Sequence, residues 1–378
     1  MTLRSIVAAG FYIAMVPALG ATGTWTGPML AAPFAAVQAP ASVPAQNDAP
    51  LHAARIERLN AATGLQAMIG QTPRDAQAAA WFAWTVASIP QHHDGNWNER
   101  GENRCVLDED GNFEGNGGVG GQATSLLILV RATRGTIDRV AFADSRCPVD
   151  AGARTIYWLE GVRSADSVQT LAAVVRRDAG AFKGDDGDGA SRCGKRALAA
   201  LALHADATAG QALETFVAPS NSRWLRRDAA FWLGAVRADQ AFPLLDRLAR
   251  TDADESFRDH LTFVLTLTGD RGLQTLLDLA RHDPSPHVRG QALFWVGQKA
   301  GQKAIGSLDA AVNNDPDSDV RKKAVFAISQ LPHDESVPKL IELARTHRDP
   351  EVRKQAMFWL GQSGDDRAVA FFESVLTK

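Results

Sequence analysis

Five blocks of the sequence decide the fold: LRRDAAFWLG from Leu225, FRDHLTFVLT from Phe257, VRGQALFWVG from Val288, VRKKAVFAIS from Val320 and VRKQAMFWLG from Val352. Each block begins 31 or 32 residues after the previous one, and a short turn and a second apolar-periodic segment follow it. Two helical segments in about 32 residues, repeated at a fixed period, are typical of an α-solenoid.

The repeats extend towards the N-terminus with more divergence. Residues 193–203 (CGKRALAALAL) align as a unit that begins 32 residues before Leu225, and residues 151–159 (AGARTIYWL) align 42 residues before Cys193. We assign the ten extra residues to the Gly/Asp-rich stretch at 184–189. The sequence therefore predicts about seven two-helix units, which fill residues 151–378.

Residues 51–150 have a different character. Short strands are expected at 81–86 and 126–131, and residues 136–144 (TIDRVAFAD) alternate in the way of a half-buried strand. A helix is expected near 52–69. This part of the chain is predicted to be a small α+β module that caps the solenoid or leads into it.

The N-terminus has the pattern of an export signal. Arg4 precedes an apolar stretch at 6–19, and Ala18-Leu19-Gly20 offers small residues for cleavage. We expect a signal peptide at 1–21 and an Ala/Pro-rich linker at 22–50, which places the protein in the periplasm or outside the cell. The alternative is an uncleaved N-terminal anchor, which would be the protein's contact with a membrane.

The charge balance excludes some classes of partner. The chain carries 40 Lys and Arg against 43 Asp and Glu, for a formal net charge of -3. Nucleic acids and anionic membranes bind basic surfaces, so neither is expected as a partner. The partner that we expect is a protein or a peptide.

The pattern V-R-x-x-A-x-x-x-L-G of the blocks resembles the HEAT-like repeats of the phycobilisome-lyase type. The lead-in at 146–152 and 157–162 is similar to secreted bacterial HEAT-repeat proteins of unassigned function. The resemblance implies a mainly α fold, a right-handed α-solenoid. Lyase activity in the namesake family belongs to members that handle bilin pigments. No bilin site is evident in this sequence, so neither that activity nor a cofactor is expected.

One arginine recurs directly after the first apolar position of each block. On a helix of about 100° per residue, that first position and the later apolar positions form the core face. The arginines lie beside turns that bear Asp, so we expect them to link each unit to the one before by charged hydrogen bonds. An anion-binding role is the alternative. The residues are Arg226, Arg258, Arg289, Arg321 and Arg353.

A phenylalanine recurs roughly 120° around the helix from the first apolar position (Val288 in its block), with polar positions on both sides of it. Two interpretations stay open: the rings stack and seal the joints between units, or they form a semi-exposed surface that holds a partner. The Trp in the adjoining position is interpreted as core packing. The candidate partner-binding residues are Phe231, Phe263, Phe294, Phe326 and Phe358, with Tyr157 at the same position of the first unit.

The three cysteines are expected to have different roles. Cys193 occupies the position of Leu225 and Val288, so it should be a buried, unreactive thiol. Cys105 and Cys147 remain as the natural disulfide pair in an exported protein. A bridge between Cys147 and Cys193 is the competing arrangement.

One loop has the residue types of a metal site. His92, His93 and Asp94 are near Glu99 and Glu102, but no second ligand pair follows at a fixed spacing, and solvated residues are the simpler interpretation. No metal site is therefore predicted.

The leading hypothesis is a non-enzymatic interaction scaffold that uses the solenoid surface. The alternative is an enzyme or metal-binding protein with its site in residues 80–150 and the solenoid as a substrate clamp.

Overall fold

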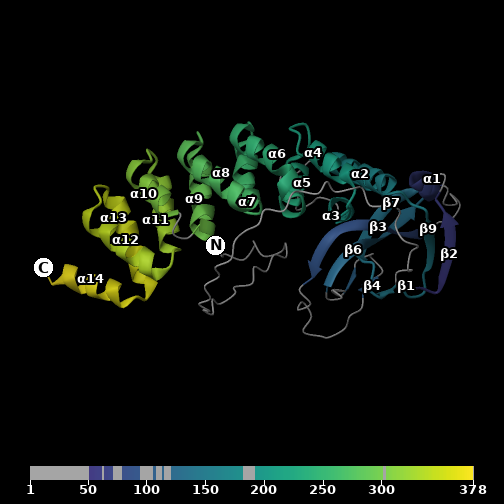
Figure 1. The fold of residues 1–378 in the computed structure, drawn as a ribbon, viewed down its shortest axis with the longest axis horizontal. Helices are drawn as coiled ribbons and strands as arrows, with labels where there is room; N and C mark the ends of the chain where they lie inside the picture. The colour runs from purple at the N-terminus through teal and green to yellow at the C-terminus, as the bar shows by residue number, and fades with distance from the viewer. Residues whose placement is uncertain are drawn as a thin grey trace, which may run out of the picture. The chain divides into compact units, whose positions relative to one another are not determined.

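The computed structural model describes residues 51–61, 64–70, 79–93, 105–107, 113–114, 121–181, 192–300 and 304–377. All of these belong to one compact unit, Gln46–Lys378. All of the described strands come first in the chain, with one short helix among them. The other helices then follow in sequence order (Figure 1).

A five-stranded sheet forms the centre of the N-terminal module. Its order is β2 (Arg55–Asn60), β9 (Thr155–Glu160), β3 (Ala80–His93), β6 (Gly121–Thr133) and β7 (Thr136–Asp144). β3, β6 and β7 are antiparallel neighbours, whereas β9 runs parallel to both β2 and β3. Arg134 and Gly135 join β6 to β7 with φ angles of 53° and 74°, which suits the twist of a two-residue hairpin. The strands expected at 81–86, 126–131 and 136–144 are confirmed.

Both faces of this sheet are buried in a hydrophobic core. Successive side chains of a strand point to opposite faces, so neighbouring residues belong to different cores. Trp81, Ala83, Leu127 and Leu129 belong to a core shared with a small second sheet. Their neighbours, such as Phe82, Trp84 and Ile128, belong to the core of the helices. The small sheet contains β1 (Leu51–His52), β8 (Val149–Asp150), β4 (Cys105–Leu107) and β5 (Phe113–Glu114).

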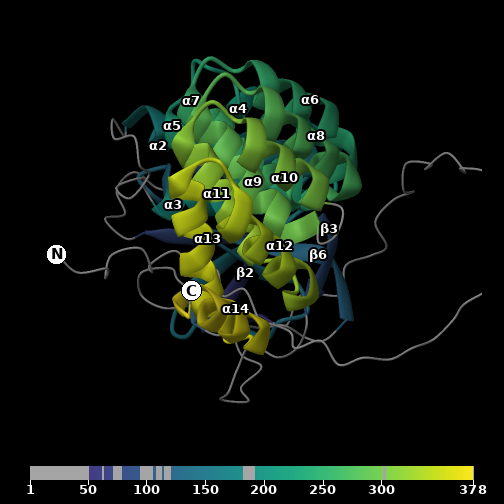
Figure 2. The ribbon, with the colours of Figure 1, turned by 90° about the vertical axis from the view of Figure 1, so that its left-hand side faces the viewer.

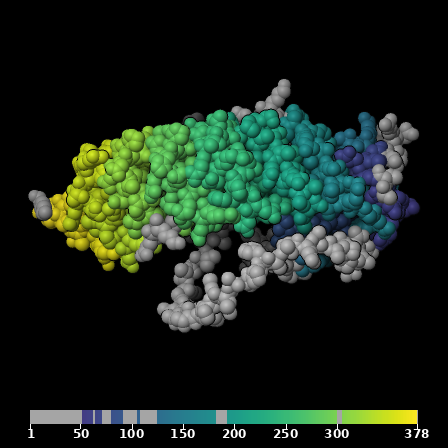
Figure 3. All heavy atoms as spheres, turned by 45° about the horizontal axis from the view of Figure 1, so that its top comes forward, coloured from purple at the N-terminus to yellow at the C-terminus, as the bar shows by residue number. Residues whose placement is uncertain are grey.

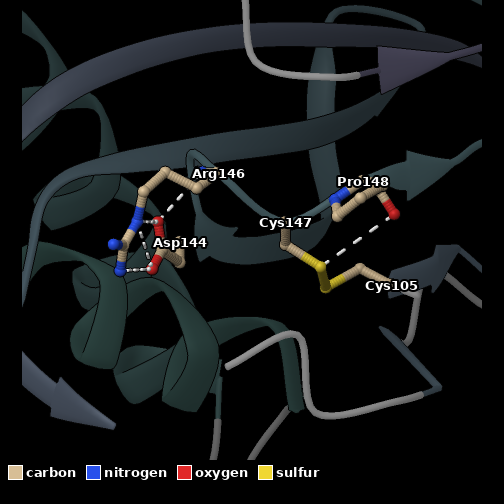
Figure 4. Close-up of a disulfide and its surroundings, with 5 residues drawn as sticks. All are labelled: Cys105, Asp144, Arg146, Cys147 and Pro148. Carbon is tan, nitrogen blue, oxygen red and sulfur yellow. Dashed lines mark hydrogen bonds and ion pairs between the residues drawn. A yellow bond between two sulfur atoms is a disulfide. The ribbon is translucent and has the colours of Figure 1, made fainter. Parts of the chain in front are cut away.

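A disulfide fastens the small sheet. Cys105 of β4 is bonded to Cys147, as Figure 4 shows, and the predicted pairing is confirmed. Asp144 and Arg146 form an ion pair of 2.6 Å beside it. Cys193 is a free, buried cysteine, and its burial raises the pKa of the thiol to about 11. The competing bridge from Cys147 to Cys193 is therefore wrong, and Cys193 is unreactive as expected.

Two predictions for the N-terminal half are wrong. The helix expected near 52–69 is confined to α1 (Leu65–Gly70), because residues 51–60 form β1 and β2. Residues 151–159, expected to begin the first repeat, contain most of β9. Ile156 and Trp158 point into one core, while Tyr157 lies on the other face with its ring 5.4 Å from that of Phe82. This strand pairing replaces the helix that the alignment with the repeats implied.

The helical part begins at α2 (Ser164–Ala181), so the boundary expected at 151 lies within the sheet. Six two-helix repeats follow, and the six predicted units that begin between Cys193 and Val352 are confirmed. The pairs are α3 (Arg192–Ala202) with α4 (Ala207–Phe216), α5 (Arg223–Val236) with α6 (Ala238–Thr251), α7 (Glu255–Leu265) with α8 (Gly269–His282), α9 (Pro286–Ala300) with α10 (Ile305–Asn314), α11 (Ser318–Ser329) with α12 (His333–Thr346), and α13 (Pro350–Ser363) with α14 (Asp366–Leu376).

The first helices of successive repeats pack on one another in the order α3, α5, α7, α9, α11 and α13. The second helices form the other layer, as Figure 2 shows. The repeats follow one another in sequence order along the face drawn in Figure 3. Aspartates in the connecting turns start many of the helices, since their carboxylates accept hydrogen bonds from the first free N–H groups, as Asp254 and Asp317 do.

Hydrogen bonds join the module to the helices. The N–H of Ile89 in β3 donates to the carbonyl of Leu203 (2.9 Å), and the N–H of Ala205 donates to the carbonyl of Ala87 (3.0 Å). The hydrophobic core also continues from Phe82 in the sheet to Phe371 in α14. The module is thus the N-terminal cap of the solenoid. None of the helices described is both long and apolar enough to span a membrane.

Candidate partner-binding face

Seven aromatic rings of the first helices form a continuous series from one repeat to the next. Phe231 stacks on Phe263 with ring centres 6.3 Å apart and planes at 4°, and Phe294 stacks on Phe326 at 6.0 Å and 6°. We call the whole series the aromatic row; its members are Phe231, Phe263, Trp295, Phe294, Phe326, Trp359 and Phe358.

Tryptophans connect the stacked pairs. The ring of Trp295 lies 5.3 Å from that of Phe263 and 4.8 Å from that of Phe294. Trp359 lies 4.9 Å from Phe326 and 5.0 Å from Phe358. The Trp position, interpreted from the sequence as core packing, therefore also bridges neighbouring units through the row.

The row is neither buried nor fully exposed. The first six rings are partly buried, since each contacts the ring of a neighbouring helix. Phe358 is 53% exposed, because no further repeat covers it among the described residues. The two interpretations of the Phe positions thus combine: the rings seal the joints, and they also present aromatic surface to solvent. Tyr157, expected at the first position of the series, lies in β9 instead.

Polar residues border the row. Helical side chains lean towards the N-terminus, so the residues three and four positions before each ring lie beside it; we call these the flanking positions. We include the same positions of α3, although this helix carries Ala199 in place of a ring. Together the flanking positions hold six basic and two acidic residues. The residues are Lys195, Arg196, Arg227, Lys322, Lys323, Lys354, Asp228 and Asp259.

The two acidic flanking residues lie near the N-terminal half of the row. Asp259 pairs with His287 at 3.2 Å. Desolvation raises the pKa of Asp228, although the charges of Lys195 and Arg227 oppose that shift. Burial also disfavours the charged form of His260 and lowers its pKa to about 4. This imidazole is therefore neutral at pH 7, and it forms a hydrogen bond of 3.0 Å with the Arg227 carbonyl.

The recurring arginines have a structural role. Arg258 donates to the Asp252 carbonyl at 2.7 Å and to the Asp283 carboxylate at 3.1 and 3.2 Å. Arg289 repeats this arrangement one unit later, with the Asp283 carbonyl at 3.0 Å and the Asp315 carboxylate at 2.8 and 2.9 Å. Each of these two arginines therefore bonds to the turn before its own helix and to the turn before the first helix of the next repeat. The sequence predicted only a link to the preceding unit. With their donors used in this way, Arg258 and Arg289 offer no anion-binding surface.

The second helices present a different face. Successive helices are tied by ion pairs such as Arg271 with Asp239 (2.9 Å) and Lys339 with Asp309 (2.8 Å), and Arg250 pairs with Asp278. The helices α4, α6, α8, α10, α12 and α14 carry eleven acidic and seven basic residues. These helices are net acidic and several of their charges are paired between neighbours, so the first-helix face is the better candidate for binding.

Much of the alternative site in residues 80–150 lies outside the described residues. Asp94, Glu99 and Glu102 lie outside the described residues. Among the residues that the structure describes, no three or more His, Cys, Asp or Glu side chains gather as metal ligands would. A pocket of about 300 Å³ lies between α1, the β6–β7 turn and α2, where Arg177 donates to the Ile137 carbonyl at 2.6 Å. Its lining includes Thr136 and Thr170 but no His, Cys, Asp or Glu.

A buried Ser–His pair was not evident from the sequence, since its members lie in separate elements. The Nε2 atom of His204 lies 2.9 Å from the Ser167 hydroxyl, which also accepts a hydrogen bond of 2.9 Å from the Trp84 indole. Both residues are completely buried, so no substrate reaches them. The pair stabilises the junction between module and solenoid.

The basic flanking residues of α3, by contrast, could be found from the sequence. The 32-residue alignment places Lys195 at the position of Arg227.

Comparison with protein families agrees with the repeats. A model of HEAT repeats matches residues 273–346 and 307–378, and a model of the PBS lyase HEAT-like repeat matches residues 225–251. The chain therefore contains HEAT repeats of the type that the resemblance implied. No curated protein matches it in sequence.

Several solved structures are similar to this chain. The Escherichia coli protein YibA is 21% identical, with 58% of this chain and 82% of that one covered and a TM-score of 0.34. The CpcE–CpcF complex of phycocyanin lyase from Nostoc is 20% identical (54% and 79% covered, TM-score 0.29). Kap121p bound to Pho4p is 14% identical (56% and 27% covered, TM-score 0.35). At these TM-scores the likeness carries no inference about function.

Proposed function

We propose that this HEAT-repeat protein is a non-enzymatic scaffold that binds a segment of another protein along the aromatic row. The single observation that carries the proposal is the continuity of the row, which runs over the first helices from Phe231 in α5 to Phe358 in α13. Solenoids use such extended surfaces for binding because each repeat adds a similar increment of surface.

The chemistry of the row suits a protein partner. Large aromatic side chains dominate the binding energy of many interfaces, and they do so best inside a polar rim that excludes water. The rings here are fixed by contacts with each other, so little side-chain entropy is lost on binding. The flanking positions supply the polar rim. On the second helices, by contrast, charged side chains already form ion pairs with each other.

We also propose that the protein acts in the bacterial envelope or outside the cell. The Cys105–Cys147 disulfide supports this location, since such bonds persist in oxidising compartments. The export pattern at residues 1–21 agrees with it.

Loss of rings tests the binding role. In a variant with Phe294→Leu and Phe326→Leu, the helices keep apolar packing but lose the stacked pair at the centre of the row. The control is Phe242→Leu together with Phe372→Leu, which removes two partly buried rings from the second helices. Retention of partner proteins from an envelope extract should fall about tenfold or more for the row variant and stay at the wild-type level for the control. Equal retention by wild type and the folded row variant would exclude the row as the binding face.

A further inference from the structure

We infer that the segment bound by the aromatic row is acidic as well as apolar, and that it lies over α9, α11 and α13. This inference rests on the proposed function and specifies the partner of the same face. Three basic residues and no acidic one occupy the flanking positions of these three helices: Lys322, Lys323 and Lys354.

The charge of this region opposes that of the chain. The whole protein has a formal net charge of -3, and the second helices carry eleven acidic against seven basic residues. The acidic flanking residues Asp228 and Asp259 belong to α5 and α7, outside the region. A positive surface beside half-buried rings attracts acidic segments and repels basic ones.

Lys323 is placed beside the central ring pair. A Cβ atom added to Gly290 would lie 2.4 Å from the Cδ atom and 3.0 Å from the Nζ atom of Lys323. The Lys323 side chain therefore lies across the surface of α9, over the position that this glycine leaves open, close to where Phe294 and Phe326 stack. Glycine at the α9 flanking position allows the ammonium to reach across two helices.

The other two lysines extend the charge along the row. Lys354 is exposed next to Phe358 on α13. Lys322 is 34% exposed and pairs with Asp319 at 3.1 Å, although that carboxylate is itself 79% exposed. Exposed pairs of this kind contribute little stability, so a carboxylate of a partner can replace Asp319.

The observations favour a protein segment over a nucleic acid. Arginines are the preferred phosphate ligands, but over α9 and α11 the recurring arginines are held by aspartates of the joints, Arg289 by Asp315 and Arg321 by Asp349. The paired rings are also stacked on each other, so bases have fewer ring faces on which to stack. The pI near 6.3 is far below that of typical nucleic-acid-binding domains.

Two fluorescein-labelled peptides of equal length test the inference on the full chain by fluorescence anisotropy. Both carry the same Phe and Leu residues, with Glu at every polar position of one and Lys at every polar position of the other. We expect the Glu peptide to bind about tenfold more tightly at low salt, and salt to weaken its binding. The variant K322E/K323E/K354E should reverse this preference.

A matched control changes the net charge equally but elsewhere. The variant R247E/R281E/R345E alters three exposed cations of the second helices and should keep the wild-type preference. If the Lys peptide binds as tightly as the Glu peptide, or if both triple variants behave alike, the inference is wrong. The proposed function survives that result if Phe294→Leu with Phe326→Leu weakens both peptides, and it fails if this variant weakens neither. Displacement of the Glu peptide by oligo(dT) at equal concentration would favour a nucleic acid and overturn the inference.

Discussion

At the scale of single residues, the joints between repeats depend on buried Arg–Asp pairs. Asp283 accepts two hydrogen bonds from Arg258, caps the following turn through the N–H of Ser285, and its carbonyl accepts one from Arg289. One aspartate therefore joins the helices α7 and α9. Removing one partner of a buried pair leaves the other charge without compensation, which is the costly way to change such a site.

Asp283→Ala should lower the free energy of unfolding by about 3–5 kcal/mol, because the buried Arg258 loses its carboxylate partner and the Ser285 N–H loses its cap. Asp319→Ala, which removes a carboxylate that is 79% exposed, should change it by less than about 0.5 kcal/mol. Thermal unfolding followed by circular dichroism compares the two. Similar melting temperatures for the two variants would show that the buried pairs do not hold the joints.

His204 should make stability depend on pH. Burial lowers the pKa of its imidazole to about 4, below the ordinary 6.5 that applies to the unfolded chain. The unfolded state therefore gains the proton first as the pH falls. The contribution of His204 is fully present above pH 6.5 and is lost towards pH 4, at a total of about 3 kcal/mol.

Urea unfolding at pH 7 and at pH 4.5 measures this loss, with His204→Gln as the comparison. The variant should be less stable than wild type at pH 7, but its stability should fall less between the two pH values. An identical fall in wild type and variant would contradict the assignment to His204.

At the scale of elements, helix packing depends on small residues that recur three positions after the ring. A Cβ atom on Gly297 would lie 2.9 Å from the Ala327 Cβ and 3.0 Å from its carbonyl oxygen, so α9 and α11 approach closely there. Gly361 occupies the same position in α13, and a Cβ atom there would contact nothing within 4 Å. The same residue type thus serves packing in one helix and has no such role in the other.

Gly297→Ala should destabilise the protein, because the backbone of α11 cannot move away from the added methyl group without opening the joint. Gly361→Ala should stabilise it by about 0.5–1 kcal/mol through the higher helix propensity of alanine. Melting temperatures of the two variants check the opposite signs. A gain in both variants would mean that α9 and α11 are not in close contact.

The repeats could be predicted from the sequence because each unit makes local contacts with a fixed period. The first helices from Cys193 to Val352 follow directly from that period. β9 could not be predicted in the same way, since its apolar residues at 156–159 fit a helix block in the alignment. Its partner β2 lies about 100 residues earlier, with Ile56 opposite Ile156, and no local pattern shows such a pairing.

The sequence predicts which residues form the candidate site, but not how deeply each ring is buried or where the lysine side chains lie. The 32-residue period identifies the Phe positions, yet the burial of a ring depends on a Phe or Trp of the next unit, as with Phe326 and Trp359. The course of Lys323 over Gly290 requires the spacing between two helices. Both features are relations between neighbouring repeats, which the sequence of one repeat does not contain.

At the scale of the whole molecule, the module and the solenoid form one structure. They share a hydrophobic core, and the backbone of β3 bonds to the turn after α3. The disulfide fastens the side of the module that faces away from the helices, since Cys105 and Cys147 belong to the core of the small sheet. The cap therefore has its own covalent reinforcement.

Reduction of the disulfide should destabilise the module by about 2–4 kcal/mol, because the unfolded chain gains freedom between residues 105 and 147. The Cys105→Ser/Cys147→Ser variant should melt at a lower temperature than wild type. Cys193→Ser serves as a cysteine control: it keeps the disulfide, so its melting temperature should fall on reduction by as much as that of wild type. An unchanged melting temperature on reduction would show that the disulfide adds nothing to the cap.

The most direct test of the binding role compares two exposed positions in the last repeat. Phe358 is 53% exposed at the end of the aromatic row, and Val369 is 54% exposed on the second helix of the same pair. A photo-crosslinking amino acid placed at each position reports which face the partner occupies in the cell that produces the protein. The proposal predicts adducts to a partner protein from position 358 and none from position 369. Adducts from position 369 alone, or equally from both, would contradict it.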